Sequence, residues 1–296
     1  MDLAGYILVC LIWGSTWLAI KLGLEAKVPP FLGAALRFLV ASAIMTPLAW
    51  IYRREAFFNR AAWRLALITG FFSFFIGYGL NYWGGDSIPS GLSALTFSFF
   101  PIWVALLAHF MIGEKFSTGK LAAIALGIAG IAVLYWGSFT SLGGAALAGM
   151  GWVTISVMVQ GWSNLTIKRD GAGVPTLFLN AVAMGSGSFC LFIAAAVHHE
   201  FAKPFPHSTI AWGSIFYLGT FGSIATFMIY YRLLKTWSAT AMALIAMITP
   251  PISVLLGHWL NHETLAPQTL VGGALVMTGV GGFVFASRKP RKSSAL

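Results

Sequence analysis

The sequence predicts an all-α integral membrane protein with ten transmembrane helices in two inverted five-helix repeats. Three observations lead to this prediction: the composition, an internal repeat and the distribution of basic residues. The chain of 296 residues is 58% hydrophobic and only 9% charged, which is more apolar surface than a soluble protein of this length can bury. A membrane protein is therefore the expected class.

Apolar runs of about 20 residues, the length of a helix that crosses a bilayer, recur along the whole chain. Helices are expected because lipid cannot satisfy exposed backbone groups. The first run lacks a basic flank and a small-residue cleavage site, so it is interpreted as a span and not as a signal peptide. The ten expected spans are roughly 3–22, 31–51, 65–83, 90–112, 119–136, 147–167, 176–197, 210–231, 238–260 and 268–286. The short connections leave no room for a soluble domain.

The second half of the chain repeats the first. A shift of 149 positions aligns residues 63–134 with the second half without a gap and pairs Trp63 with Trp212, Tyr82 with Tyr231, Pro101 with Pro250, His109 with His258 and Glu114 with Glu263. We assign residues 1–143 to the first repeat and residues 144–296 to the second. An odd number of spans in each repeat inverts the second copy, an arrangement that builds a central site open to either side in turn.

The basic residues are sorted by side of the membrane. In a model with ten spans, 14 of the 18 Lys and Arg residues fall on one side: Arg53, Arg54, Arg60, Arg64, Lys115, Lys120, Lys168, Arg169, Arg232, Lys235, Arg288, Lys289, Arg291 and Lys292. The other side receives Lys21, Lys27 and Lys203, and Arg37 lies inside the second span. This positive-inside pattern places both termini in the cytoplasm. It also explains the net charge of +10 without a nucleic-acid partner.

Prolines and small residues carry the packing information. Pro101 in the fourth span and Pro250 and Pro251 in the ninth should kink their helices, and we interpret the three as hinges; the alternative is that the kinks only improve packing. Ala125 and Ala129 in the fifth span, with Ala274 and Thr278 in the tenth, are expected to form helix-packing faces. A homodimer seam is the less favoured interpretation of these faces, so a monomer is expected.

Nothing in the sequence indicates an enzyme, a metal site or a cofactor. It contains no nucleophile elbow, zinc-protease helix motif or phosphate loop. No Asp or Glu lies deep in a span, although proton- and sodium-driven carriers commonly use a buried carboxylate. Arg37 has three open interpretations: it could reach the membrane surface, pair with helix carbonyls or meet a substrate carboxylate.

Polar and aromatic side chains inside the spans predict a central cavity. Buried amides and hydroxyls need partners, so the faces that carry them should turn inward. Aromatic rings beside uncharged hydrogen-bonding groups suit a moderately apolar solute that is neutral or zwitterionic. The alternative is hydrogen bonding between helices together with anchoring at the lipid interface. The candidate solute-binding residues are Trp13, Trp17, Tyr78, Asn81, Tyr82, Trp103, Trp162, Asn164 and Tyr231.

Several motifs resemble the drug/metabolite transporter superfamily in its EamA-type branch of ten helices. They are Ile12-Trp-Gly-Ser-Thr-Trp17, Val28-Pro-Pro, Arg37-Phe, Pro101 followed by Gly113-Glu-Lys, Ser238-Ala-Thr, Ile248-Thr-Pro-Pro and Glu263-Thr-Leu. The stretch Asn261-His-Glu263 departs from the Gly-Glu usual in that family. The resemblance implies two inverted repeats, cytoplasmic termini and a central cavity, and the aromatic amino-acid exporters are the most similar functional group.

The resulting hypothesis is an exporter of small metabolites, with aromatic or other hydrophobic amino acids as the solute and the bacterial inner membrane as the location. Alternating access through the central cavity is the expected mechanism. Efflux of amphipathic drugs is one alternative. A non-transporting receptor or assembly subunit is another, less favoured because no soluble sensing domain is expected.

Overall fold

The computed structural model describes residues 2–88, 93, 96–115, 117–134, 136, 144–202, 208–261 and 267–287, and within these ranges the chain is helical, with no strand. The first half contains α1 (Asp2–Glu25), α2 (Pro30–Tyr52), the short η1 (Arg54–Phe58), α3 (Arg60–Thr69), η2 (Gly70–Gly77), α4 (Tyr78–Asp86), α6 (Phe100–Ile112) and α7 (Thr118–Leu134). The second half contains α8 (Gly144–Asp170), α9 (Thr176–Val197), the short η4 (Glu200–Ala202), α10 (Thr209–Gly219), η5 (Thr220–Ala225), α11 (Thr226–Thr236), α12 (Ala239–Ala243), α13 (Ile245–Asn261) and α14 (Pro267–Ser287).

Among the described residues, six helical stretches are long and apolar enough to cross a membrane. They are Leu3–Glu25, Pro30–Tyr52, Arg60–Asp86, Thr176–Val197, Thr209–Thr236 and Ala239–Leu260. Three shorter apolar helices cover Phe100–Ile112, Thr118–Val133 and Leu270–Ala286, and α8 is 27 residues long over the expected sixth span. Most of residues 89–95, where the expected fourth span begins, lie outside the described ranges. The count of ten membrane crossings stays a prediction.

Local structure repeats at the same offset of 149 residues as the sequence. Asn59 caps α3 by accepting hydrogen bonds from the backbone of Ala61 and Ala62, and Ser208 caps α10 by accepting one from Ala211. Each of these helices then widens into a π-helix, η2 in the first half and η5 in the second, before α-helical geometry resumes. The π-helix is a rare geometry that is frequent at functional sites, so its recurrence marks a feature common to both halves.

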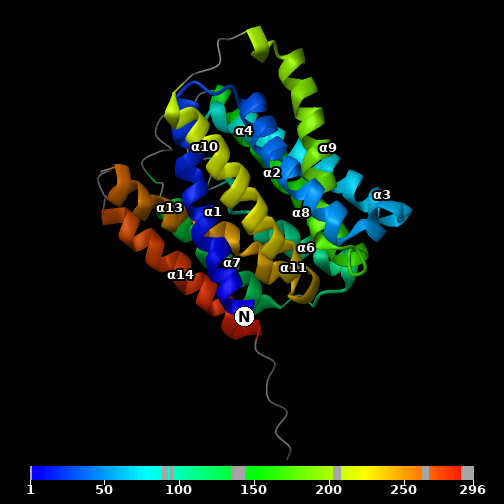
Figure 1. The fold of residues 1–296 in the computed structure, drawn as a ribbon. Helices are drawn as coiled ribbons and strands as arrows, with labels where there is room; N and C mark the ends of the chain where they lie inside the picture. Colours follow the sequence, from blue (N-terminus) through cyan, green and yellow to red (C-terminus); the bar gives the residue numbers. More distant parts are fainter. Residues whose placement is uncertain are drawn as a thin grey trace, which may run out of the picture.

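The helices pack as equivalent pairs drawn from both halves (Figure 1). Helix α2 packs on its counterpart α9, and α7 packs on its counterpart α14. Helix α1 of the first half corresponds to α8 of the second. Helix α1 packs on α13 and α10, and α8 packs on their counterparts α6 and α3. The two halves are therefore intertwined and share one core, with α3 and α9 on one flank of the molecule and α13 and α14 on the other.

The prediction for the packing face of α7 and α14 is wrong. Ala125, Ala129, Ala274 and Thr278 are exposed on the outside of the pair. The contact is instead made by glycines on the opposite faces: a Cβ atom at Gly279 would lie 2.6 Å from the backbone nitrogen of Gly127. Alanine and glycine are both small, but only glycine allows the two backbones to approach this closely.

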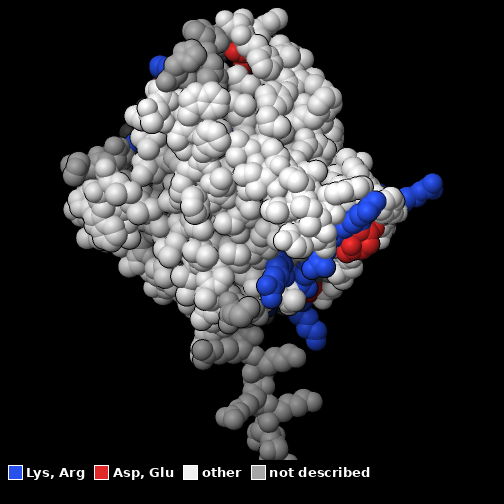
Figure 2. Space-filling model, in the orientation of Figure 1, with Lys and Arg blue, Asp and Glu red and all other residues white. Residues whose placement is uncertain are grey.

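Basic side chains gather near the ends of α3 and α11, at the end of the molecule that also holds the N-terminus, while most of the face seen in Figure 2 is uncharged. Exposed basic residues at this end are Arg53, Arg54, Arg60, Arg64, Arg169 and Arg232. A broad uncharged surface with most of the exposed basic side chains at one end suits a protein surrounded by lipid.

Candidate functional site

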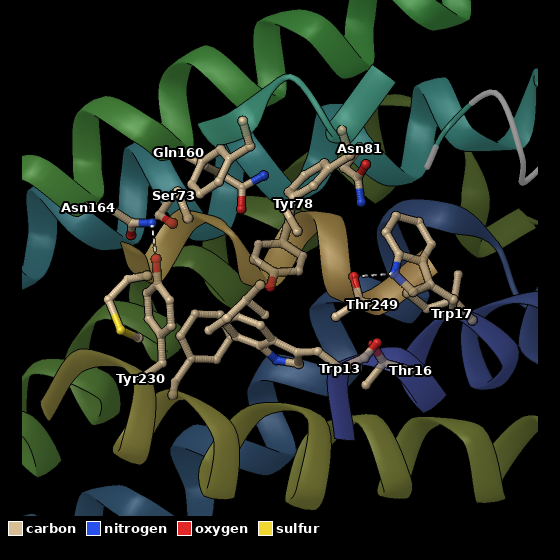
Figure 3. A pocket seen from close by; sticks show the side chains of 18 of the residues that line it. Trp13, Thr16, Trp17, Ser73, Tyr78, Asn81, Gln160, Asn164, Tyr230 and Thr249 are labelled. Carbon is tan, nitrogen blue, oxygen red and sulfur yellow. Dashed lines mark hydrogen bonds between the residues drawn. The ribbon is translucent and has the colours of Figure 1, made fainter. Parts of the chain in front are cut away.

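A cavity of about 90 Å³ lies in the middle of the molecule (Figure 3). Its lining combines aromatic rings, amides and hydroxyls with the one cation Arg37, and no acid lines it among the described residues. The lining residues are Trp13, Thr16, Trp17, Ile20, Arg37, Ser73, Tyr78, Asn81, Phe97, Phe100, Gln160, Asn164, Phe227, Tyr230, Met242, Ala243, Ile245, Ala246 and Thr249. The cavity has room for several water-sized groups.

Both halves of the chain build this cavity from equivalent positions. At an offset of 149 residues, the lining pairs Tyr78 with Phe227, Asn81 with Tyr230, Phe97 with Ala246 and Phe100 with Thr249. A site lined by counterparts from the two halves lies where the halves meet. The chemistry of the pairs differs, because Phe97 and Phe100 are larger and more apolar than Ala246 and Thr249.

The tryptophans of α1 form an aromatic wall. The Trp13 ring packs against Phe227 at 5.2 Å and Tyr230 at 5.0 Å between ring centroids. Its Nε1 donates to the carbonyl of Gly222 at 3.3 Å. Trp17 lies one turn further along α1, and its Nε1 donates to Oγ1 of Thr249 at 3.5 Å. Both indoles are therefore held in place by partners from the second half.

Amide side chains from α4 and α8 complete the lining. Nδ2 of Asn164 donates to the Tyr230 hydroxyl at 2.9 Å (Figure 3), and Nε2 of Gln160 donates to Oγ of Ser156 at 2.9 Å. Oδ1 of Asn81 is buried and has no hydrogen-bond partner among the described residues. A buried acceptor without a partner is costly, so this oxygen is available to a donor on a bound solute.

Of the nine predicted solute-binding residues, five line the central cavity: Trp13, Trp17, Tyr78, Asn81 and Asn164. Tyr82 lines two adjoining cavities instead, and Tyr231 is buried behind the wall against Phe227. Trp103 donates to the carbonyl of Met158 and fastens α6 to α8. Trp162 is 36% exposed and packs on Phe72. The list of candidate residues omitted Phe227 and Tyr230, which the internal offset from Tyr78 and Asn81 could have found.

The predicted hinge prolines flank two breaks in the helices beside the cavity. A turn at Ser98 and Phe99 precedes Pro101, which occupies the first turn of α6. In the second half, the break falls at Leu244 between α12 and α13, and Pro250 and Pro251 lie inside α13. Residues next to both breaks line the cavity. A hinge role for the three prolines stays a prediction.

A second cavity, of about 210 Å³, leads from the central one toward the C-terminal end of α1. The two share Trp17, Ile20 and Asn81, and the second one reaches Lys21 and Glu25. These two residues are exposed enough to form a solvent-facing pair at 4.0 Å. The central site thus communicates with this end of the molecule.

The opposite end is closed by contacts between the two halves. The Tyr6 ring stacks on Trp237 at 5.5 Å, and its hydroxyl donates to the carbonyl of Ala241 at 3.1 Å. Oε2 of Glu114 accepts a hydrogen bond from the backbone of Ala239 at 3.1 Å. Cys10, one turn above Tyr6 on α1, is buried between this closure and the cavity.

Replacing Glu114 with alanine is expected to loosen this closure, because the backbone of Ala239 then loses its partner across the two halves. In a Cys190→Ser background, we expect Cys10 to react with a small maleimide several times faster in the Glu114→Ala protein. The exposed Glu55→Ala serves as a control that should leave the rate unchanged. Equal Cys10 labelling in both variants would show that Glu114 does not hold this end shut.

Comparisons with known proteins give a consistent result. The protein is 23% identical over 292 residues to the uncharacterized transporter YoaV of Bacillus subtilis, which covers 96% of this chain and 98% of that protein. It is 26% identical over 287 residues to the uncharacterized inner membrane transporter YedA of Escherichia coli, covering 94% and 90%. A solved crystal structure with 18% sequence identity superposes with a TM-score of 0.81 over 97% of both chains and establishes the fold alone.

The model of the EamA-like transporter family matches this chain twice in succession, over residues 3–136 and 137–285. The boundary between the two matches falls between α7 and α8. These matches together cover nearly the whole chain, so the protein belongs to the EamA-like transporter family and is a multi-pass membrane protein.

Proposed function

We propose that this protein is an alternating-access carrier that exports small metabolites, with aromatic or other hydrophobic amino acids as the solute class. The observation that carries the proposal is a central cavity that is lined by equivalent positions of the two halves and adjoins a second cavity toward one end of the molecule, while described contacts between the halves close the other end. A site of this kind can serve both sides of a membrane if the halves exchange their arrangements.

The proposed architecture has ten transmembrane helices in two inverted repeats, residues 1–143 and 144–296. Paired helix contacts between counterparts, such as α2 with α9, support a two-fold relation between the halves. Basic residues near the N-terminal end of α1 support cytoplasmic termini. The proposed form is a monomer in the inner membrane. The closed end would then face the cytoplasm, and the second cavity would open to the outside.

Indole and phenyl rings on one side of the cavity, and amides on the other, suit a solute with an apolar side chain and a polar head. Trp13, Trp17 and Phe97 supply apolar contact, which favours an aromatic or branched side chain. The unpartnered Oδ1 of Asn81 is an acceptor for an ammonium group. The lining contains no carboxylate among the described residues, which favours facilitated exchange over coupling through a buried acid.

Counterflow in proteoliposomes tests the proposal without an assumed driving force. Vesicles loaded with millimolar tryptophan, phenylalanine or leucine should accumulate the same labelled amino acid transiently, whereas empty vesicles should not. The Trp17→Ala and Tyr82→Ala variants are expected to lower accumulation at equal protein levels. If no amino acid in a full panel showed counterflow, the proposed carrier function would be contradicted. If amphipathic drugs were transported in preference to amino acids, drugs would be the solute class instead.

A further inference from the structure

Arg37 is a buried cation at the wall of the central cavity. It lies in α2, is only 2% exposed and is among the largest fully buried side chains in the described part of the protein. Arginine stays protonated in proteins, so a full positive charge is held in the middle of a membrane domain. Holding a charged side chain inside a membrane costs free energy, and charged residues at such places are typical of substrate and ion pathways.

The guanidinium is held by neutral partners from both halves. Nε donates to Oγ of Ser223 at 2.8 Å, Nη2 donates to the carbonyl of Gly222 at 2.8 Å, and Nη1 donates to the Tyr82 hydroxyl at 3.3 Å. The Tyr78 ring lies 5.2 Å from Cζ. These contacts fix the position of the charge inside the cavity wall and exclude the interpretation that the side chain reaches out to the membrane surface.

The π-helical turn η5 places the Gly222 carbonyl and the Ser223 hydroxyl within hydrogen-bond distance of the Arg37 guanidinium. The carbonyl of Gly222 accepts hydrogen bonds from Arg37, from Trp13 and from the hydroxyl of Thr226. A Cβ atom at residue 222 would lie 3.4 Å from Nη2 of Arg37 and 2.9 Å from Thr16. The tight contact is the one with Thr16, so glycine at this position allows α1 and η5 to approach closely, and this approach places the Gly222 carbonyl where Arg37 can reach it.

No acid neutralises Arg37 within the described residues. Two ion pairs in the described part of the chain, Lys21 with Glu25 and Arg169 with Asp170, lie at the surface and do not involve Arg37. A guanidinium has five N–H donors, and the described residues engage three of them. One N–H group on each terminal nitrogen has no partner among the described residues, and Arg37 is part of the cavity lining. The two terminal nitrogens of a guanidinium form a fork that can bind a carboxylate through two parallel hydrogen bonds.

We propose that Arg37 is the receptor for the carboxylate of the transported solute. The inference rests on the proposed carrier function and narrows its substrates to small organic acids and zwitterions that carry an apolar side chain. Oδ1 of Asn81 accepts from the ammonium of a zwitterion, and the aromatic wall takes the side chain. The solute thereby supplies the counter-charge that no described residue provides at this place, so binding offsets part of the cost of the buried charge.

Four phenyl compounds with different head groups test the assignment on the unmodified protein. L-Phenylalanine, 3-phenylpropionate, L-phenylalaninamide and phenethylamine are compared as competitors of amino-acid counterflow and as thermal stabilisers of the detergent-solubilised protein; leucine, leucinamide and isopentylamine repeat the comparison on an aliphatic side chain. We expect the compounds without a carboxylate to bind at least about tenfold more weakly than those with one. Equal competition by phenethylamine and phenylalanine would overturn the assignment.

Variants of Arg37 then test whether this residue is the source of the preference for a carboxylate. Arg37→Gln should bind phenylalanine and phenethylamine equally weakly, whereas Arg37→Lys, which keeps the charge without the fork, should retain part of the preference. Ser223→Ala removes one positioning contact and should weaken binding while keeping the preference for the carboxylate. A full preference in a folded Arg37→Gln protein would overturn the proposal, and should that variant fail to fold, the head-group comparison on the unmodified protein decides the question.

The two proposals fail in different ways. If no solute of any head group shows counterflow or thermal stabilisation, the carrier function itself is contradicted. If solutes are exchanged irrespective of the carboxylate, the carrier stands and only the role of Arg37 is wrong.

Discussion

Replacement of Gly279 by alanine is expected to separate α7 from α14 and to destabilise the folded protein by about 3 kcal/mol, the upper range for overpacking a well-packed contact. The added Cβ would lie 2.6 Å from the backbone nitrogen of Gly127 and 2.7 Å from the carbonyl oxygen of Ala123. Backbone atoms cannot rotate away as a side chain can, so the whole helix must move. In lipid, close packing of this kind is a main source of helix association.

Gly273→Ala on the same helix is the matched control, because a Cβ atom there meets nothing within 4 Å. Both substitutions gain the same helix propensity over glycine, about 1 kcal/mol, so their difference isolates the contact. The fraction of monodisperse protein that survives heating in detergent, followed by size-exclusion chromatography, measures the effect. Equal survival of the two variants would show that the α7–α14 pair tolerates a wider spacing.

The second large effect is expected at Trp13. Trp13→Ala removes the indole that packs on Phe227 and Tyr230 and that donates to Gly222. Truncation of a large aromatic side chain costs about 3–5 kcal/mol in folded stability, and here it also deletes a cavity wall. We expect counterflow to fall at least about tenfold when protein amounts are equalised, a loss of transition-state free energy of roughly 1.4 kcal/mol or more.

Trp162→Ala makes the fitting comparison because the sequence predicted both tryptophans as cavity residues. Trp162 is 36% exposed on the outer surface, so its removal should leave counterflow close to that of the unmodified protein. Trp13→Phe, which keeps a ring against Phe227 and Tyr230, should restore most of the stability lost in Trp13→Ala. A transport defect in Trp162→Ala as large as that in Trp13→Ala would contradict the position of the cavity.

The sequence predicted the apolar helices and the repeat well because both depend on features that are local or periodic. Apolar run length predicts a helix in lipid irrespective of its neighbours, and identical Trp and Pro residues at a fixed offset reveal duplication without any knowledge of packing. The family membership followed from the same motifs. The count of crossings and the inverted orientation stay predictions.

The direction of individual side chains could not be predicted as well. Trp103, Trp162 and Tyr231 have the composition of cavity residues, yet helix rotation turns them toward α8, toward the outer surface and toward the buried core. The rotation of α7 was misjudged for the same reason, since Ala125 and Gly127 lie on different faces of one apolar helix. When every face of a helix is apolar, hydrophobic periodicity carries no rotational information.

The two π-helices also bear on the history of the chain. Each interrupts an otherwise α-helical segment, and both occur at matching positions, Gly70–Gly77 and Thr220–Ala225. Duplication of a half-length sequence that already contained the irregular turn accounts for both, whereas independent origins would require the same irregularity twice. On this account the turn that holds Arg37 is older than the single-chain protein.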